Sequence, residues 1–198
     1  SSAASDVYKR QISSSVYKQL ASPTRIGGSN RYEVAANVVK KYYSSAKSAI
    51  ISNGYAYADG LTGSVLAAKQ NRPMMFTNAS SLPTPTREVI GSKNMTTFTV
   101  LGGTVSLQSN VVSQLKNPIV GKKIFIDAGH GGTDSGAVGN GLYEKSVNLD
   151  VAKLINTKLS NGGALPVMAR TNDTYLTLAQ RVSCLLYTSD AADDSLRV

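Results

Sequence analysis

The sequence lacks the features of a disulfide-stabilised or a membrane-spanning protein. It contains a single cysteine, Cys184, so no disulfide can form within the chain. This excludes a small secreted scaffold held by disulfides, although a bacterial extracellular protein without disulfides remains possible. No apolar run approaches the roughly 20 residues of a transmembrane helix, and residues 1–6 lack the charged-then-apolar layout of a signal peptide.

Acidic residues are also scarce. The 198 residues include 12 Asp and Glu against 21 Lys and Arg, which gives a formal net charge of +9. A basic surface favours polyanionic partners such as nucleic acid, a membrane surface or an acidic wall polymer. Because no stretch spaces aromatic and basic residues as nucleic-acid-binding modules do, we expect no nucleic-acid partner.

The two ends of the chain differ in character from the rest. Residues 1–11 are polar and without period, and the pattern of the chain changes abruptly at residues 184–198. Both stretches resemble translated sequencing-adapter read-through, so we expect them to be non-native tails. Finding the same codons after re-amplification of the locus would refute this interpretation.

Short apolar segments alternate with helical patterns between residues 31 and 115. The expected strands are 48–52, 73–77 and 97–101, and the expected helices cover 31–43, a segment capped by Asp59, a segment with Pro85 in its first turn, and 107–115. This alternation predicts an α/β fold with a small parallel sheet covered on both faces. The length favours one or two domains.

A short pattern occurs twice in this part of the chain. Ser-x-Val-x-x-Gln-Leu is found at 14–20 and again at 109–115, which is 95 residues later. It is either a chance match between short polar helices or the mark of a repeat of small-domain size. On the second interpretation, residues 12–24 are the end of a preceding repeat.

Three glycine-containing motifs lie in the segment that follows. They are Arg25-Ile-Gly-Gly-Ser-Asn-Arg-Tyr32, Ala58-Asp-Gly-Leu-Thr-Gly-Ser64 and Val100-Leu-Gly-Gly103. Together they resemble the cell-wall-binding repeat of the second type, found on Gram-positive surface proteins, over residues 25–117. The resemblance implies non-covalent binding to an anionic secondary cell-wall polymer, further repeats in the parent protein, and an extracellular place at the bacterial cell wall or surface layer.

Arg25 and Arg31 are the candidate polymer-binding residues. They flank the glycine turn at 27–28, where guanidinium groups and backbone N–H groups can together meet a phosphate or a carboxylate. The alternative is that Arg31 forms an internal ion pair with Asp59 and that the glycines only shape a turn. Residues 118–122, which follow this domain, are expected to be a short linker that begins at Pro118.

The second half of the chain opens with an apolar run followed by glycines. Residues 123–126 predict a buried strand, and the turn after it places His130, the only histidine, at the strand's carboxyl end. Glu144 opens the next helical pattern, so both side chains could face one point. Imidazole and carboxylate are both competent zinc ligands. Alternatively, His130 is merely solvated or hydrogen-bonded.

Four segments in this half carry a second resemblance. Residues 126–132, Glu144, 169–173 and 178–182 resemble the zinc-dependent N-acetylmuramoyl-L-alanine amidases, over residues 122–183. The resemblance implies an α/β amidase domain whose Zn²⁺ is held by His130, Glu144 and a second histidine, with a catalytic glutamate near the domain end. Neither of these last two residues is present, so the catalytic residue is unknown. We expect 123–183 to be a truncated domain, partly disordered and inactive in this chain.

Two further residues have alternative interpretations. Asp127 could orient His130 by accepting a hydrogen bond from its ring, as histidine ligands usually require, or it could cap the turn. Arg170 resembles the arginine that follows the family's second strand, and its alternative role is a surface ion pair with Asp173.

The sequence supports two hypotheses of different classes. The first is a peptidoglycan hydrolase anchored to the wall, which cleaves the N-acetylmuramoyl-L-alanine amide bond. The second is a non-catalytic adhesin or surface-layer module. A nucleotide-binding domain is disfavoured because the chain has no G-x-x-x-x-G-K-[ST] motif.

Overall fold

The computed structural model describes residues 12–193, and the chain divides into two compact units between Ser113 and Gln114. The expected tail at 1–11 and residues 194–198 of the expected second tail lie outside the described residues. Each unit is described by itself below.

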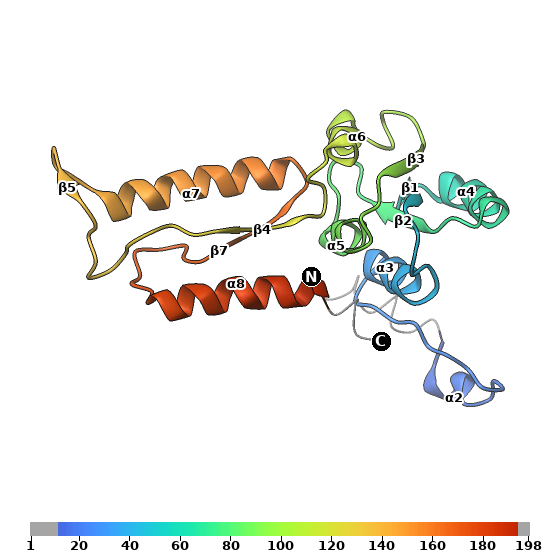
Figure 1. The fold of residues 1–198 in the computed structure, drawn as a ribbon. Helices are drawn as coiled ribbons and strands as arrows, with labels where there is room; N and C mark the ends of the chain where they lie inside the picture. Colours follow the sequence, from blue (N-terminus) through green and yellow to red (C-terminus); the bar gives the residue numbers. More distant parts are fainter. Residues whose placement is uncertain (1–11, 194–198) are drawn as a thin grey trace. The chain divides into compact units, whose positions relative to one another are not determined.

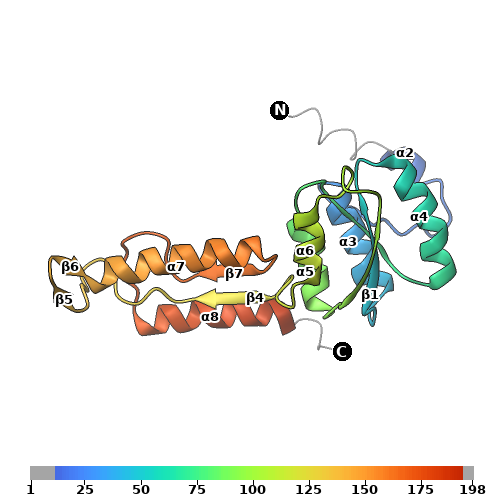
Figure 2. The ribbon, with the colours of Figure 1, turned by 90° about the horizontal axis from the view of Figure 1, so that it is seen from above.

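The first unit contains a three-stranded parallel sheet in the order β2-β1-β3. Its elements are α2 (Ser14–Tyr17), α3 (Arg31–Tyr42), β1 (Ser48–Asn53), α4 (Tyr57–Gln70), β2 (Met74–Thr77), α5 (Thr84–Ser92), β3 (Thr97–Leu101) and α6 (Ser109–Lys116), which crosses the division between the units. Helix α4 covers one face of the sheet, and α3 and α5 lie on the other (Figures 1 and 2). The expected α/β class with a small parallel sheet is confirmed.

The core of this unit forms where β1 meets its covering helices. Ile50 and Ile51 of β1 are fully buried, and so are Val39 of α3 and Val89 of α5. Helix α3 begins at an Asn30 cap, whose side chain accepts hydrogen bonds from the backbone N–H groups of residues 32 and 33. A side-chain cap of this kind satisfies donors that the first helical turn leaves free.

The second unit is a parallel strand pair between two helices. Its elements are β4 (Lys123–Ile126), β5 (Val138–Gly139), β6 (Leu142–Tyr143), α7 (Glu144–Asn161), β7 (Leu165–Met168) and α8 (Leu178–Asp193). Strand β4 pairs with β7, and α7 and α8 lie on opposite sides of the pair (Figures 1 and 2). The small buried cluster joins β4 to α7 through Ile126, Ala128, Leu149 and Ala152.

Much of the apolar surface of α7 stays exposed. Val147, Val151, Leu154 and Ile155 are 42–64% exposed, although their spacing gave the helix its predicted apolar pattern. Two strands and two helices offer too little partner surface to bury both sides of such a helix.

One local prediction differs from the structure, and the structure describes two other segments more closely. Asp59 lies inside the first turn of α4, whose N-cap is Ala56. The expected linker at 118–122 belongs to the second unit, where the Gly121 N–H donates to the Gly163 carbonyl at 2.9 Å. In the segment 12–24, the only helix is the single turn α2.

Candidate functional site

Three successive residues with positive φ form the loop after β4. His130, Gly131 and Gly132 have φ values of +60°, +135° and +56°. Non-glycine residues occupy this region at a cost of roughly 1–3 kcal/mol and persist there only when surrounding contacts hold them. The loop therefore presents the His130 side chain at the carboxyl end of β4, as the sequence predicts.

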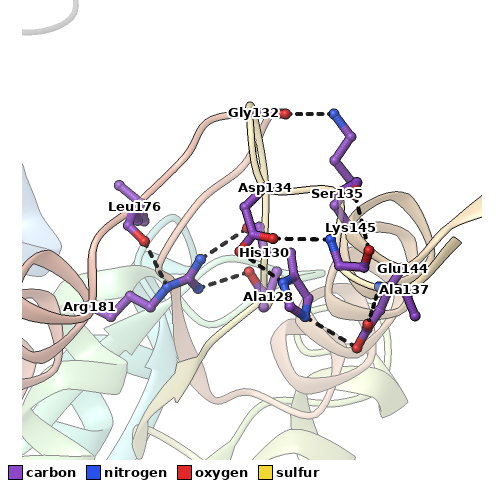
Figure 3. A network of polar contacts seen from close by, with 12 residues as sticks. Ala128, His130, Gly132, Asp134, Ser135, Ala137, Glu144, Lys145, Leu176 and Arg181 are labelled. Carbon is purple, nitrogen blue, oxygen red and sulfur yellow. Dashed lines mark hydrogen bonds and ion pairs between the residues drawn. The ribbon is translucent and has the colours of Figure 1, made fainter.

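His130 lies between two carboxylates (Figure 3). Its Nδ1 is 2.9 Å from Oδ2 of Asp134, and its Nε2 is 3.4 Å from Oε1 of Glu144. The backbone N–H of Gly136 donates to the other oxygen of Asp134 at 3.1 Å. Asp134 thus fixes the ring orientation and leaves Nε2 directed toward Glu144.

Glu144 is held in place from the other side. It is the first residue of α7, and its Oε2 accepts a hydrogen bond from the Ala137 N–H at 2.8 Å. Residue 137 reaches this position because it immediately precedes β5, which pairs with β6 just before Glu144. A Cβ at Gly136 would lie 2.7 Å from Cδ2 of His130 and 2.8 Å from Cβ of Glu144. Only glycine fits between the two side chains.

The electrostatics of this group follow from its hydrogen bonds. The pKa of His130 is raised above its usual value, first because Asp134 accepts its hydrogen bond and further because Glu144 lies close by. The pKa of Asp134 is lowered, mainly by the same hydrogen bond with His130. The pKa of Glu144 is lowered chiefly by the Ala137 N–H. Both carboxylates are therefore stabilised in their ionised form.

The pair of His130 and Glu144 fits a zinc ion. Tetrahedral zinc with nitrogen and oxygen ligands at about 2.0–2.1 Å separates the two ligand atoms by about 3.3 Å, and the observed Nε2–Oε1 separation is 3.4 Å. A ligand histidine usually gives its second nitrogen to a carboxylate, which is the role that Asp134 has here. Within residues 12–193, no group of three or more His, Cys, Asp or Glu side chains could hold a metal ion.

Asp127 does not have the place that the sequence suggested. The structure gives the Nδ1 contact to Asp134, whereas the Asp127 carboxylate accepts a hydrogen bond from Arg181. Little in the sequence pointed to Asp134, because the residues that separate it from His130 lie in an irregular glycine loop. The one sequence feature that indicated a turn there was Asp134 two residues before Gly136.

Arg170 does not form the surface ion pair with Asp173 that the sequence offered as its alternative role. It is 4% exposed and donates to four backbone carbonyls, those of residues 128, 129, 145 and 172. Asp173 pairs with Lys145 instead, at 2.7 Å. Arg181, 9% exposed, donates to the carbonyls of Ala128 and His130 at 3.0 Å each (Figure 3). Sequence reasoning missed the role of both arginines as supports of the histidine loop.

The two arginines predicted to bind polymer line one pocket of the first unit. This pocket has a volume of about 830 Å³ and is otherwise lined largely by apolar side chains of residues 12–38 and of β2. Arg25 donates to the Ile12 carbonyl and stacks over the Tyr17 ring at 4.7 Å. Arg31 donates to the Gly54 carbonyl and stacks over the Tyr55 ring at 4.0 Å.

The glycine turn between these arginines is well supported. A Cβ at Gly28 would lie 2.7 Å from the Val34 nitrogen, so this glycine allows a close approach to α3. Asn37 donates to the Gly27 carbonyl at 2.8 Å. The turn therefore has a defined shape beside the pocket.

Comparison with known families assigns the two units. Residues 25–112 match the family described as cell wall binding domain 2, and residues 124–193 match the N-acetylmuramoyl-L-alanine amidase family. The chain joins a cell wall binding domain of the second type to a segment of an N-acetylmuramoyl-L-alanine amidase. Both resemblances noted in the sequence are confirmed.

Several known proteins are similar to all or part of this chain. The N-acetylmuramoyl-L-alanine amidase LytC of Bacillus subtilis (strain 168) is 54% identical over 172 residues, which are 87% of this chain and 35% of that protein. The germination-specific N-acetylmuramoyl-L-alanine amidase of the same organism is 51% identical over 59 residues, 30% of this chain and 25% of that protein. The solved structure of Cwp6 from Clostridium difficile matches with a TM-score of 0.46 and 26% identity, covering 86% of this chain and 29% of that one. This chain thus spans about a third or less of the length of these relatives.

Proposed function

We propose that this chain is part of a wall-anchored peptidoglycan hydrolase that cleaves the amide bond between N-acetylmuramic acid and L-alanine. The observation that carries the proposal is the His130–Glu144 pair, oriented by Asp134, inside the segment that matches the amidase family. The family resemblance implies zinc as the cofactor. When bound, zinc polarises the scissile carbonyl and lowers the pKa of water.

The residues of this chain would prepare that chemistry. His130 and Glu144 would hold the ion, and Asp134 would keep the imidazole in the tautomer whose Nε2 is free. A catalytic zinc site needs three protein ligands and one open position. The described residues supply two, so a further ligand and the general base must come from elsewhere in a complete enzyme.

A segment exchange in LytC tests the hydrolase proposal. Residues 124–183 of this chain replace the matching segment of LytC, and purified peptidoglycan is assayed for newly freed L-alanine amino groups. We expect the exchanged enzyme to release them and to lose the activity on His130→Ala or Glu144→Ala. Lys153→Ala, on the exposed surface of α7, is the matched control. An active exchanged enzyme that tolerates both site substitutions would refute the assignment of the ligands.

The first unit would supply wall attachment, and we propose an anionic secondary wall polymer as its partner. Arg25 and Arg31 meet at one pocket beside a supported glycine turn, and the whole chain carries an excess of basic residues. Both guanidinium groups also have partners within the protein. The pocket would therefore offer an already oriented cationic edge beside apolar surface, which suits a charged saccharide.

Wall-pelleting experiments test this second part. The full chain is mixed with Gram-positive walls before and after chemical removal of the secondary polymer. We expect binding to depend on the polymer and to weaken in Arg25→Gln and Arg31→Gln, whereas Lys69→Gln on the exposed surface of α4 removes the same charge and serves as control. Equal losses in all three variants would indicate nonspecific charge attraction.

An extracellular place at a Gram-positive wall follows from the same proposal. Among the helices of residues 12–193, none has the length and apolar character needed to cross a membrane. The alternative, a non-catalytic surface-layer or adhesin module, would bind walls equally well. It would bind no zinc at His130 and would fail the segment exchange.

A further inference from the structure

The two proposed zinc ligands stand on different elements. His130 lies in the loop after β4, and Glu144 opens α7. Their separation therefore depends on whatever ties the loop to the helix. The side-chain contact between the ligands themselves is only a 3.4 Å approach of Nε2 to Oε1.

The Arg170 guanidinium connects the loop to the helix through hydrogen bonds. Its Nη2 donates to the carbonyl of Gly129 at 2.9 Å and to the carbonyl of Lys145 at 2.8 Å. Gly129 immediately precedes His130, and Lys145 immediately follows Glu144. One nitrogen atom thus holds the backbone on both ligand positions at once.

The other two nitrogens of the Arg170 guanidinium group also donate hydrogen bonds. Its Nε donates to Ala128 at 2.8 Å and its Nη1 to Asn172 at 3.0 Å, so the fork is anchored at the end of β7 while it reaches the loop. Arg181 differs in one respect, because its hydrogen bonds to described residues go to Asp127, to the histidine loop and to Leu176, none of which lies in α7. Arginine presents five N–H donors in a rigid plane. Lysine, with one rotatable ammonium, cannot reach four carbonyls in these directions.

We propose that Arg170 is a positioning residue that sets the distance between His130 and Glu144 and thereby the affinity of the chain for zinc. The inference rests on the proposed metal centre. It assigns Arg170 no contact with substrate or metal. A purely structural arginine would stabilise the unit without changing how strongly the folded unit binds the ion.

The test compares zinc binding by the full 198-residue chain and its Arg170→Lys and Arg72→Lys variants. Arg72 is the matched control, because it also donates to a buried strand carbonyl, that of Ala49, but in the first unit. The affinity for Zn²⁺ is measured by chelator competition. Binding at the site is followed through the ring protons of His130, the only histidine in the chain.

We expect Arg170→Lys to weaken Zn²⁺ binding about tenfold or more, the usual effect of losing a group that orients a ligand, and Arg72→Lys to leave it unchanged. The zinc-induced rise in melting temperature of the second unit separates affinity from folding, because it reports binding to the folded state. A merely structural role would lower the melting temperature but leave the rise intact. If the Arg170 variant does not fold in buffer, the measurements are repeated for all chains in trimethylamine N-oxide, which favours the compact state.

The outcomes distinguish the inference from the proposal on which it rests. If the unchanged chain binds no zinc, or if His130→Ala does not weaken binding, His130 and Glu144 do not hold the ion without the further ligand, and the positioning role in this chain is overturned with them. If the unchanged chain binds zinc through His130 and Arg170→Lys binds it equally well, only the positioning role is overturned.

Discussion

Gly136 offers a direct test of how the proposed ligand pair is packed. Its φ of +63° lies in the left-handed region, and a Cβ there would lie 2.7 Å from the His130 ring and 2.8 Å from both Cβ and Oε2 of Glu144. Gly136→Ala therefore has two consequences. The backbone becomes strained, by roughly 1–2 kcal/mol, and the side chains of His130 and Glu144 are forced apart.

Gly141→Ala separates these two effects. Gly141 has a similar φ of +75°, but a Cβ there would meet nothing within 4 Å. The strain alone should lower the melting temperature of the second unit by roughly 4–16 °C in both variants, since 1 kcal/mol corresponds to about 4–8 °C in a domain of this size. The steric displacement acts only at residue 136.

Zinc affinity is the deciding measurement. We expect Gly136→Ala to bind Zn²⁺ about tenfold more weakly or worse, a loss of at least about 1.4 kcal/mol, whereas Gly141→Ala keeps the affinity of the unchanged chain. Chelator competition at a temperature well below both melting transitions measures this. Equal affinities in the two variants would show that the ion is not held between His130 and Glu144.

The remaining predictions concern the protonation of His130 and the core of the first unit. Asp134→Asn should lower the pKa of His130 toward its usual value, because the main group that raises this pKa is removed. Titration of the single histidine by NMR checks this. An unchanged pKa would contradict the contact between His130 and Asp134. Since that pKa is raised in the folded chain, protonated His130 stabilises the metal-free protein fully below pH about 6.5, and this stabilisation should be lost as the pH rises through the folded-state pKa. Zinc binding, which needs the neutral ring, should strengthen over the same window. Ile50→Ala, at a fully buried position of β1, should cost about 2–5 kcal/mol and Ile50→Val about 0.5–1.5 kcal/mol in denaturant unfolding; a zinc affinity altered by either variant would show that the units do not fold independently.

Periodicity predicted the elements of the first unit well because they depend on short-range rules. Strand β3 has the predicted bounds, and Pro85 occupies the first turn of α5 as expected. The cap of α4 was wrong because Asp59 suits either an N-cap or the first turn, where its charge favours the helix dipole in both cases. An acidic residue suits both the N-cap and the third residue of a helix, so Asp59 alone does not show that α4 is capped by Ala56.

The proximity of the candidate pair His130 and Glu144 was predictable from the sequence, but the residues that support the pair were not. His130 and Glu144 stand out because a lone histidine after a strand and an acid at a helix start occupy recognisable local positions. Asp134 and Arg170 do not, because their roles depend on the path of a loop with successive left-handed residues and on carbonyls that are 25–42 positions away in the chain. Any arginine can donate to carbonyls, so its sequence neighbourhood gives no sign of which ones it reaches.

This difference has a physical basis that extends to the chemistry. A ligand needs only the right atom at an exposed point, whereas the two arginines that hold the backbone around it are buried and hydrogen-bonded to carbonyls. Arg170 and Arg181 are 4% and 9% exposed, while the side chains of His130 and Glu144 are 33% and 41% exposed. The open pair alone could rearrange at little cost, since exposed ion pairs contribute weakly to stability. The buried guanidinium groups beneath it restrict the backbone to one arrangement, and the zinc affinity of this unit should therefore depend as much on residues that never approach the ion as on the two that would bind it.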